Sequence, residues 1–196
     1  MQTDMTVGKP MKMILDFTIP VFIGNVFQQF YNMADAIIVG KFVGTKGLAA
    51  VGSTGTIMFL IIGFLMGLTA GFTVLTSQKF GAGKMDEMRQ SVENAELLSI
   101  IISVIMTIGS MVGMRSLLTL MNTPEDIFQD AYTYIMIICG GIFAQVLYNI
   151  LASILRALGN SKTPLYFLIL AALLNIVLDL VFIIVFHMGV AGAAWA

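Results

Sequence analysis

Residues 165–186 read LYFLILAALLNIVLDLVFIIVF, and within this stretch polar groups occur only at Tyr166, Asn175 and Asp179. A helix needs about 20 mostly apolar residues to cross the hydrocarbon core of a bilayer. The stretch is therefore long enough to span a membrane. Aliphatic residues both precede and follow Asp179, so the sequence predicts a carboxyl group at membrane depth, where ionisable residues are rare and usually functional.

The composition of the whole chain also indicates a membrane protein. The 196 residues are 58% hydrophobic and 11% charged, whereas soluble domains have about 25% charged residues. A water-soluble enzyme is excluded because it could not cover so much apolar surface. The net charge of −1 lacks the basic footprint of nucleic-acid binding. The single cysteine, Cys139, predicts a buried apolar residue, with neither a disulfide framework nor a cysteine metal site.

The pattern of apolar stretches predicts an all-α polytopic membrane protein that forms one unit over residues 1–196. No P-loop, GxGxxG, HExxH or GxSxG motif occurs, so we expect neither a cofactor nor enzymatic chemistry. We expect a piece of a longer protein or the product of a truncated gene, because the last apolar segment is too short to span. The predicted spans cover about 17–39, 48–77, 91–112, 132–155 and 165–186, and a sixth begins at 189 and is cut off at 196.

The distribution of lysine and arginine predicts the orientation. Cytoplasmic connectors of membrane proteins carry an excess of these residues. We therefore expect the N-terminus, and the connectors after the second and fourth spans, to face the cytoplasm across the plasma membrane. That side has Lys9, Lys12, Lys79, Lys84, Arg89, Arg156 and Lys162, whereas the other has Lys41, Lys46 and Arg115.

The first span has a polar stripe that ends in a carboxylate. At about 100° per residue its five polar side chains fall within an arc of roughly 120°. Such a stripe is typical of the wall of an aqueous cavity, although amides also hydrogen-bond neighbouring helices without any further role. A functional role is favoured for the carboxylate, because burying it costs more than burying an amide. The stripe consists of Asn25, Gln28, Gln29, Asn32 and Asp35.

Two later spans have polar pairs at helical spacing. Asn175 and Asp179 are four residues apart and share one helix face. A buried aspartate that changes protonation with conformation could couple a proton, whereas an aspartate with a nearby amide oxygen could ligate Na⁺. Structural hydrogen bonding is the alternative. Gln145, Tyr148 and Asn149 form a similar group, for which ordinary packing and a place in the site are equally favoured.

Several segments together resemble the MATE family of multidrug and toxic compound extrusion transporters. Pro20 is followed by Asp35, by the residues Ile-Ile-Val ending at Gly40, and by Gly44 and Leu48–Val51. The remaining matching segments are Gln78–Lys84, Arg156–Pro164, and Asn175 with Asp179. Each segment alone is weak, but their order and separations together are specific.

This resemblance implies a fold and a function. The chain would be the N-terminal six-helix lobe of a twelve-helix transporter, with its sixth helix truncated. It would need a second six-helix lobe to export small organic, often cationic compounds in exchange for H⁺ or Na⁺. The matching cation-coupling positions are Asp35, Asn149, Asn175 and Asp179, with Na⁺ considered at Asp35, Asn175 and Asp179. The substrate-cavity candidates are Asn25, Gln28, Gln29, Asn32, Gln145 and Tyr148.

Two other functions stay open at this point. The first is a flippase for lipid-linked precursors, which belongs to the same superfamily. It would favour a cationic central cavity, but the spans have no lysine or arginine near their middles. The second is a fragment that does not transport.

Overall fold

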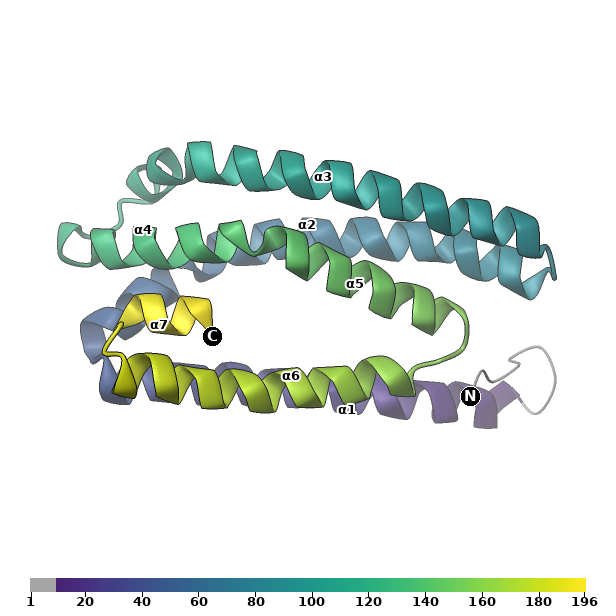
Figure 1. The fold of residues 1–196 in the computed structure, drawn as a ribbon, viewed down its shortest axis with the longest axis horizontal. Coiled ribbons are helices and arrows are strands. Elements are labelled where there is room, and N and C mark those ends of the chain that lie inside the picture. The colour runs from purple at the N-terminus through teal and green to yellow at the C-terminus, as the bar shows by residue number, and fades with distance from the viewer. Residues whose placement is uncertain (1–9) are drawn as a thin grey trace.

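The computed structural model describes residues 10–196, and these form helices joined by short connectors (Figure 1). Lys9 and the N-terminus itself, on which part of the predicted orientation rests, lie outside the described residues. The helices are α1 (Pro10–Phe42), α2 (Thr45–Gly81), α3 (Met85–Leu120), α4 (Glu125–Gly140), α5 (Ile142–Ala157), α6 (Lys162–Leu180), the π-helical turn η1 (Val181–Val185) and α7 (Val190–Trp195).

The helices extend beyond the apolar stretches that predict them. For example, α3 begins at Met85, six residues before the predicted start, because backbone hydrogen bonding continues through the charged residues that flank the span. The connectors that precede α2 and α3 contain glycines with positive φ angles, Gly44 (φ 99°) and Gly83 (φ 71°). A residue with a Cβ atom rarely adopts this conformation. Four helices are long and apolar enough to cross a membrane, and α4 and α5 add a fifth span if they are counted together.

The span predicted at 132–155 is not one straight helix, and this corrects the sequence-based expectation. The helix α4 ends at Gly140, α5 begins at Ile142, and their axes differ by 47°. The N–H of Gly141 donates to the carbonyl oxygens of both Ile137 (3.2 Å) and Ile138 (2.9 Å), which tightens the last turn of α4. Two consecutive glycines allow the bend because they have no side chains to hold the helix straight.

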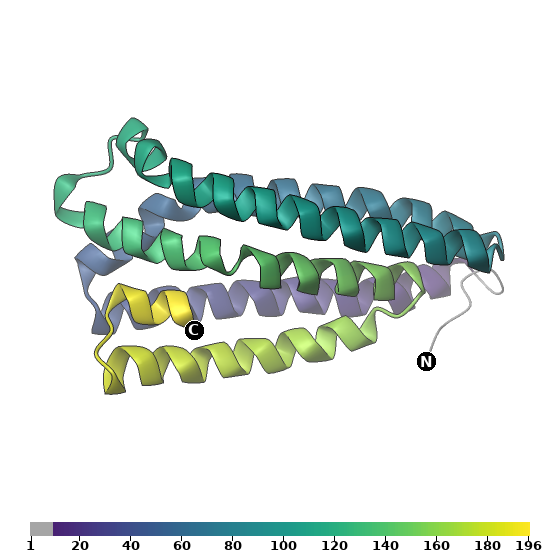
Figure 2. The same ribbon diagram turned by 45° about the horizontal axis from the view of Figure 1, so that its top comes forward.

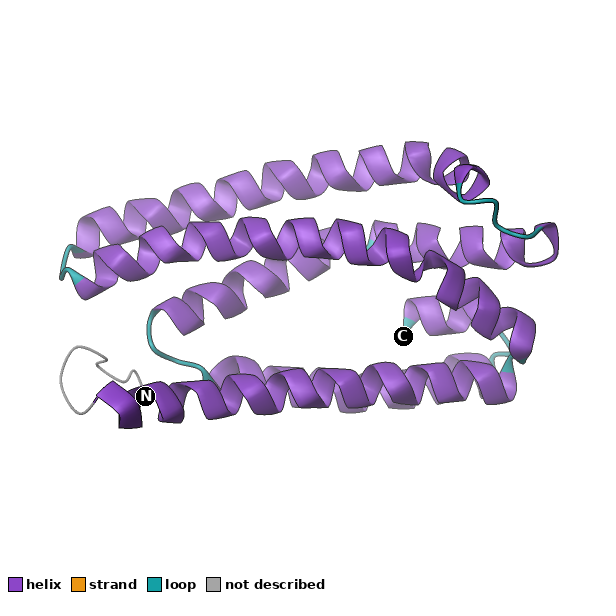
Figure 3. Cartoon of the chain, turned by 180° about the vertical axis from the view of Figure 1, so that it is seen from behind, coloured by secondary structure: helices purple, strands orange, loops and turns teal. Residues whose placement is uncertain are grey.

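The helices form two layers (Figures 1 and 3). One layer consists of α1 and α6, which pack against each other along most of their length. The other consists of α2, α3, α4 and α5. The short helix α7 lies between the layers near one end of the molecule and packs mainly against α4 (Figure 2).

The connectors alternate between the two ends of the molecule (Figure 1). The α2–α3 and α5–α6 connectors lie at the end where Pro10 lies, which we call the Pro10 end. The α1–α2, α3–α4 and η1–α7 connectors lie at the opposite end, which we call the Phe42 end. This alternation is the one expected of successive spans. Which end faces the cytoplasm stays a prediction.

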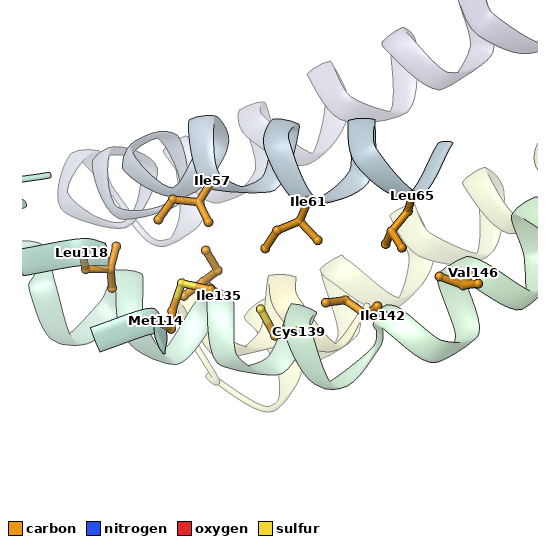
Figure 4. Packing of buried hydrophobic residues seen from close by; sticks show 9 residues of the cluster. All are labelled: Ile57, Ile61, Leu65, Met114, Leu118, Ile135, Cys139, Ile142 and Val146. Atoms are coloured by element: carbon orange, nitrogen blue, oxygen red, sulfur yellow. The ribbon is translucent and has the colours of Figure 1, made fainter. Parts of the chain in front are cut away.

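The largest core cluster joins α2, α3, α4 and α5 (Figure 4). Helices in lipid associate through close van der Waals packing, because burial away from lipid gains little hydrophobic free energy. Cys139 is a fully buried free thiol in this cluster, which confirms its predicted packing role. The cluster consists of Ile57, Ile61, Leu65, Met114, Leu118, Ile135, Cys139, Ile142 and Val146.

Two glycines let α7 approach its neighbours closely. A Cβ atom added at Gly47 of α2 would lie 2.5 Å from Val43 Cγ1 and 3.2 Å from Val190 Cγ2. A Cβ atom added at Gly192 of α7 would lie 3.1 Å from Phe182 Cβ. The corner between α1 and α2 therefore packs on α7 with no room for a larger residue at position 47.

Candidate functional site

The carboxyl groups of Asp35 and Asp179 meet between α1 and α6. They lie close enough to act on each other electrostatically. Asp35 is seven residues before the end of α1 at Phe42, and Asp179 is six residues before the end of η1 at Val185. At 1.5 Å per residue, each lies ~10 Å along the axis from that end. Asp179 is completely buried, and Asp35 is partly buried. The structure thus brings together two carboxylates that are separated by more than a hundred residues of sequence.

These carboxyl groups have no basic partner among the described residues. Both side-chain oxygens of Asp179 and Oδ1 of Asp35 are buried without a hydrogen bond, and so is Oδ1 of Asn175. The ion pairs found among the described residues lie near the ends of the helices. Lys46 pairs with Asp126, and Lys79 and Lys84 both pair with Glu87. Buried oxygen atoms without partners cost free energy, so the site is suited to a ligand that donates protons or carries positive charge.

Two tyrosines that sequence reasoning did not select stand beside the carboxyl pair. The phenol of Tyr134, from α4, interacts electrostatically with Asp35, Asp179 and Tyr31. The ring of Tyr134 also packs near Ile38 and other residues of α1, η1 and α7. Tyr31 is four residues before Asp35, so helical spacing could have identified it. No comparable signal identifies Tyr134, because its position depends on how α4 packs against α1.

A cavity of about 1140 Å³ lies between the two layers. Apolar side chains, several of them methionines, cover much of its wall. Four of its polar side chains come from α1, and the others come singly from different helices. Figure 1 shows the layers that enclose it. Half of the residues predicted to form the site line this cavity, namely Gln28, Asn32, Asp35, Gln145 and Asn175.

The other predicted site residues do not line the cavity. Asn25 and Gln29 are exposed on α1, and Tyr148 is half-buried on α5. Asn149 is buried, and its Nδ2 donates to the backbone oxygen of Gln145 (2.8 Å). Asp179 is buried behind the cavity wall, beside Asp35. The functional roles of these residues stay predictions.

The site has oxygen atoms of the kinds that hard cations prefer, and binding of Na⁺ there stays a prediction. Sodium, like other hard cations, prefers carboxylate and amide oxygens, and Asp35, Asn175 and Asp179 supply both kinds without competing hydrogen bonds at the oxygens noted above. A proton shared by the two carboxyl groups would also reduce the cost of burying these oxygens without partners. Residues 10–196 contain no group of three histidine, cysteine or acidic residues placed to hold a metal ion.

The comparison with known proteins identifies the family. The profile of the family described as MatE matches residues 20–181. The chain belongs to the MatE family. The predicted MATE resemblance is therefore confirmed, and with it the fold class of a multi-pass helical membrane protein.

Individual MatE relatives cover nearly the whole chain. It is 34% identical to the "Probable multidrug resistance protein YpnP" of Bacillus subtilis (strain 168), over 98% of this chain and 43% of that protein. It is 25% identical to the "FAD transporter" of Shewanella oneidensis, over 86% of this chain and 37% of that protein. A solved MOP superfamily transporter from Pyrococcus furiosus superimposes with a TM-score of 0.91 and 32% identity, covering 96% of this chain and 41% of that one.

The chain therefore spans about two fifths of the length of the relatives that it matches. MatE transporters are not an enzyme class. The described residues provide a cavity and an acidic site.

Proposed function

We propose that this MatE chain forms the N-terminal lobe of an antiporter that exports organic, often cationic compounds in exchange for H⁺ or Na⁺. The observation that carries the proposal is the pair of carboxyl groups, Asp35 and Asp179, buried without a basic partner among the described residues. The relative named as a multidrug resistance protein supports the same substrate class. A second six-helix lobe would complete the transport pathway across the plasma membrane.

The mechanism rests on competition for the carboxyl pair. A proton or Na⁺ bound at Asp35 and Asp179 lowers the negative charge of the pair by one unit and favours the conformation in which the layers close around it. A cationic substrate bound near Asp35 and Asn175 in the cavity favours the other conformation. Each ligand can shift the equilibrium only through its different affinity for the two conformations, so the ion gradient drives export by alternating access.

Export measurements with the full-length protein test this proposal. Asp179→Asn removes the charge and retains the shape, so we expect gradient-driven dye export to fall to the level of vesicles without transporter. Asp16→Asn changes an exposed carboxylate on the same helix as Asp35 and should leave export unchanged. Normal export by well-expressed Asp179→Asn would remove this residue from ion coupling. Collapsing the proton and sodium gradients separately identifies the coupling ion.

An anionic substrate is the second candidate. One relative is named "FAD transporter", and the sequence leaves open a lipid-linked precursor as the cargo. Against both, the described residues that line the cavity include no lysine or arginine to pair with phosphate. Competition of a fluorescent organic cation with FAD or with a polyprenyl phosphate for the full-length protein would separate these substrate classes.

A further inference from the structure

Arg115 is an exposed arginine close to one end of a membrane-spanning helix. It lies on α3, and residues 97–114, which precede it, include no charged side chain. At 1.5 Å per residue these residues extend ~27 Å, which is close to the ~30 Å thickness of a hydrocarbon core. Arg115 therefore lies where the hydrocarbon core meets the lipid headgroups, at the Phe42 end of the molecule.

The guanidinium group of Arg115 has no acidic partner in the part of the chain that the structure describes. The ion pairs among residues 10–196 are those given above, and none of them includes Arg115. The side chains of Val112 and Leu120, on either side of it, are each 80% exposed. A charge on such an apolar surface needs a partner of opposite charge or an extended stem that carries it to the headgroups.

Arg115 lines an open groove of about 820 Å³ on α3 and the turn that follows it. Thr119 lies four residues after Arg115 and three after Ser116, so these side chains share one side of the helix. The Thr119 hydroxyl donates to the backbone oxygen of Arg115 (2.9 Å). The Ser116 hydroxyl and the Asn122 amide remain as donors beside the guanidinium group. The groove is lined by Val112, Arg115, Ser116, Thr119, Leu120 and Asn122.

This set of donors suits a phosphate group. A guanidinium group binds two phosphate oxygens at once through parallel, charge-assisted hydrogen bonds, and a hydroxyl and an amide can donate to the other oxygens. The lining residues include no carboxylate that could hold the amine of a zwitterionic headgroup. The groove therefore favours an anionic phospholipid over a zwitterionic one.

An apolar stripe leads from the groove toward the middle of the membrane. Its side chains are spaced four, three and four residues apart, so they lie along one face of α3, and all are exposed. Such a face suits an acyl chain. The α3 stripe consists of Ile101, Ile105, Ile108 and Val112.

We propose that the groove at Arg115 binds the phosphate of an anionic glycerophospholipid of the surrounding membrane, with an acyl chain along the α3 stripe. Figures 1 and 2 show α3 on the side of the molecule away from α1 and α6, which carry the two buried carboxyl groups. The lipid site is thus separate from the acidic site, and it does not depend on the proposed export function.

Native mass spectrometry of the full-length protein, titrated with defined lipids in detergent, tests the site. Phosphatidylglycerol is the anionic probe, phosphatidylcholine is the zwitterionic probe, and a diglucosyl diacylglycerol with the same acyl chains has no phosphate. Arg115→Gln removes the charge and retains hydrogen-bonding groups. Arg156→Gln is the matched control, because Arg156 is also an exposed arginine near a helix end without an ion pair among residues 10–196, but lies at the Pro10 end.

We expect the wild-type protein to bind phosphatidylglycerol more tightly than either other lipid. Arg115→Gln should weaken the tightest phosphatidylglycerol binding by on the order of tenfold, the loss of hydrogen bonds to a charged group, and leave binding of the glucolipid unchanged. Arg156→Gln should keep the wild-type affinities. Equal losses in the two variants, unchanged binding by Arg115→Gln, or equal wild-type affinity for the three lipids would each overturn the site.

Two further measurements complete the test. Soluble glycerol 1-phosphate has the phosphate without acyl chains, so it should not displace phosphatidylglycerol, and full displacement would overturn the assignment to a lipid. If Arg115→Gln does not fold, the double variant Ser116→Ala/Asn122→Ala tests the same groove and should weaken phosphatidylglycerol binding roughly threefold. If a second lobe covers the groove, none of these substitutions changes lipid binding, and that result also overturns the site.

Discussion

At the residue scale, the central feature is that Asp35 and Asp179 form one site rather than two. The sequence predicted a carboxyl group at membrane depth for Asp179, because apolar residues surround it, and a functional role for Asp35 at the end of a polar stripe. It could not predict that they meet, since their proximity depends on the packing of α1 against α6. Nor could it select Tyr134, which reaches the pair from α4.

A shared site has a measurable consequence. If one cation or proton is bound by both carboxyl groups, removing either one disables the same step. In the full-length protein, Asp35→Asn should therefore reduce export as far as Asp179→Asn does, to the level of vesicles without transporter. Rates for the two variants, measured in the same vesicles as the wild-type protein, decide this. Substantial export by Asp35→Asn beside none by Asp179→Asn would show that the two carboxyl groups do not share one essential step.

At the element scale, the sequence predicts where the spans lie but not where the helices end or bend. The positions of the spans follow from the length of the apolar stretches. The predicted ends fall short of the observed helix ends, because the helices continue through the charged residues that flank each span. The bend at Gly141, between α4 and α5, has a local signal, which is two consecutive glycines. The several glycines of α2, however, leave that helix unbroken. Composition alone does not distinguish a glycine that bends a helix from one that allows close packing.

The tight packing of Gly47 against Val43, in the connector that precedes α2, predicts the effect of one substitution. Gly47→Ala would place its Cβ 2.5 Å from Cγ1 of Val43, a β-branched side chain with little rotamer freedom. We expect a loss of about 1–3 kcal/mol, which is typical of overpacking, and a lower Tm in detergent. Gly52→Ala, where an added Cβ meets no atom within 4 Å, is the control and should keep the wild-type Tm. Equal Tm values for both variants would contradict the tight packing.

At the scale of the whole molecule, hydropathy and the family motifs were sufficient to predict the fold class and the order of the spans. Successive spans must alternate in direction, and the connectors lie at alternate ends as this requires. The division into two layers had no sequence signal. Every span has apolar residues on most of its surface, so periodicity does not indicate which helices are neighbours. Half of the predicted site residues line the cavity because only one face of each helix turns toward it.

The predicted orientation can be tested with single cysteines. Asp86, at the Pro10 end, and Thr45, at the Phe42 end, are both exposed. In intact cells, a membrane-impermeant maleimide should label Thr45→Cys, and it should label Asp86→Cys only after the cells are opened. The wild-type chain is the background control, because its one cysteine, Cys139, is buried. Labelling of Asp86→Cys in intact cells would reverse the orientation.

The placement of Tyr134 gives the acidic site a further property. The two carboxyl groups are carried by the layer of α1 and α6, whereas the phenol is carried by α4 in the other layer. Any sliding of one layer over the other changes the surroundings of whatever is bound there. A change in the separation of the two layers would therefore change the distance from the phenol of Tyr134 to the carboxyl groups of Asp35 and Asp179.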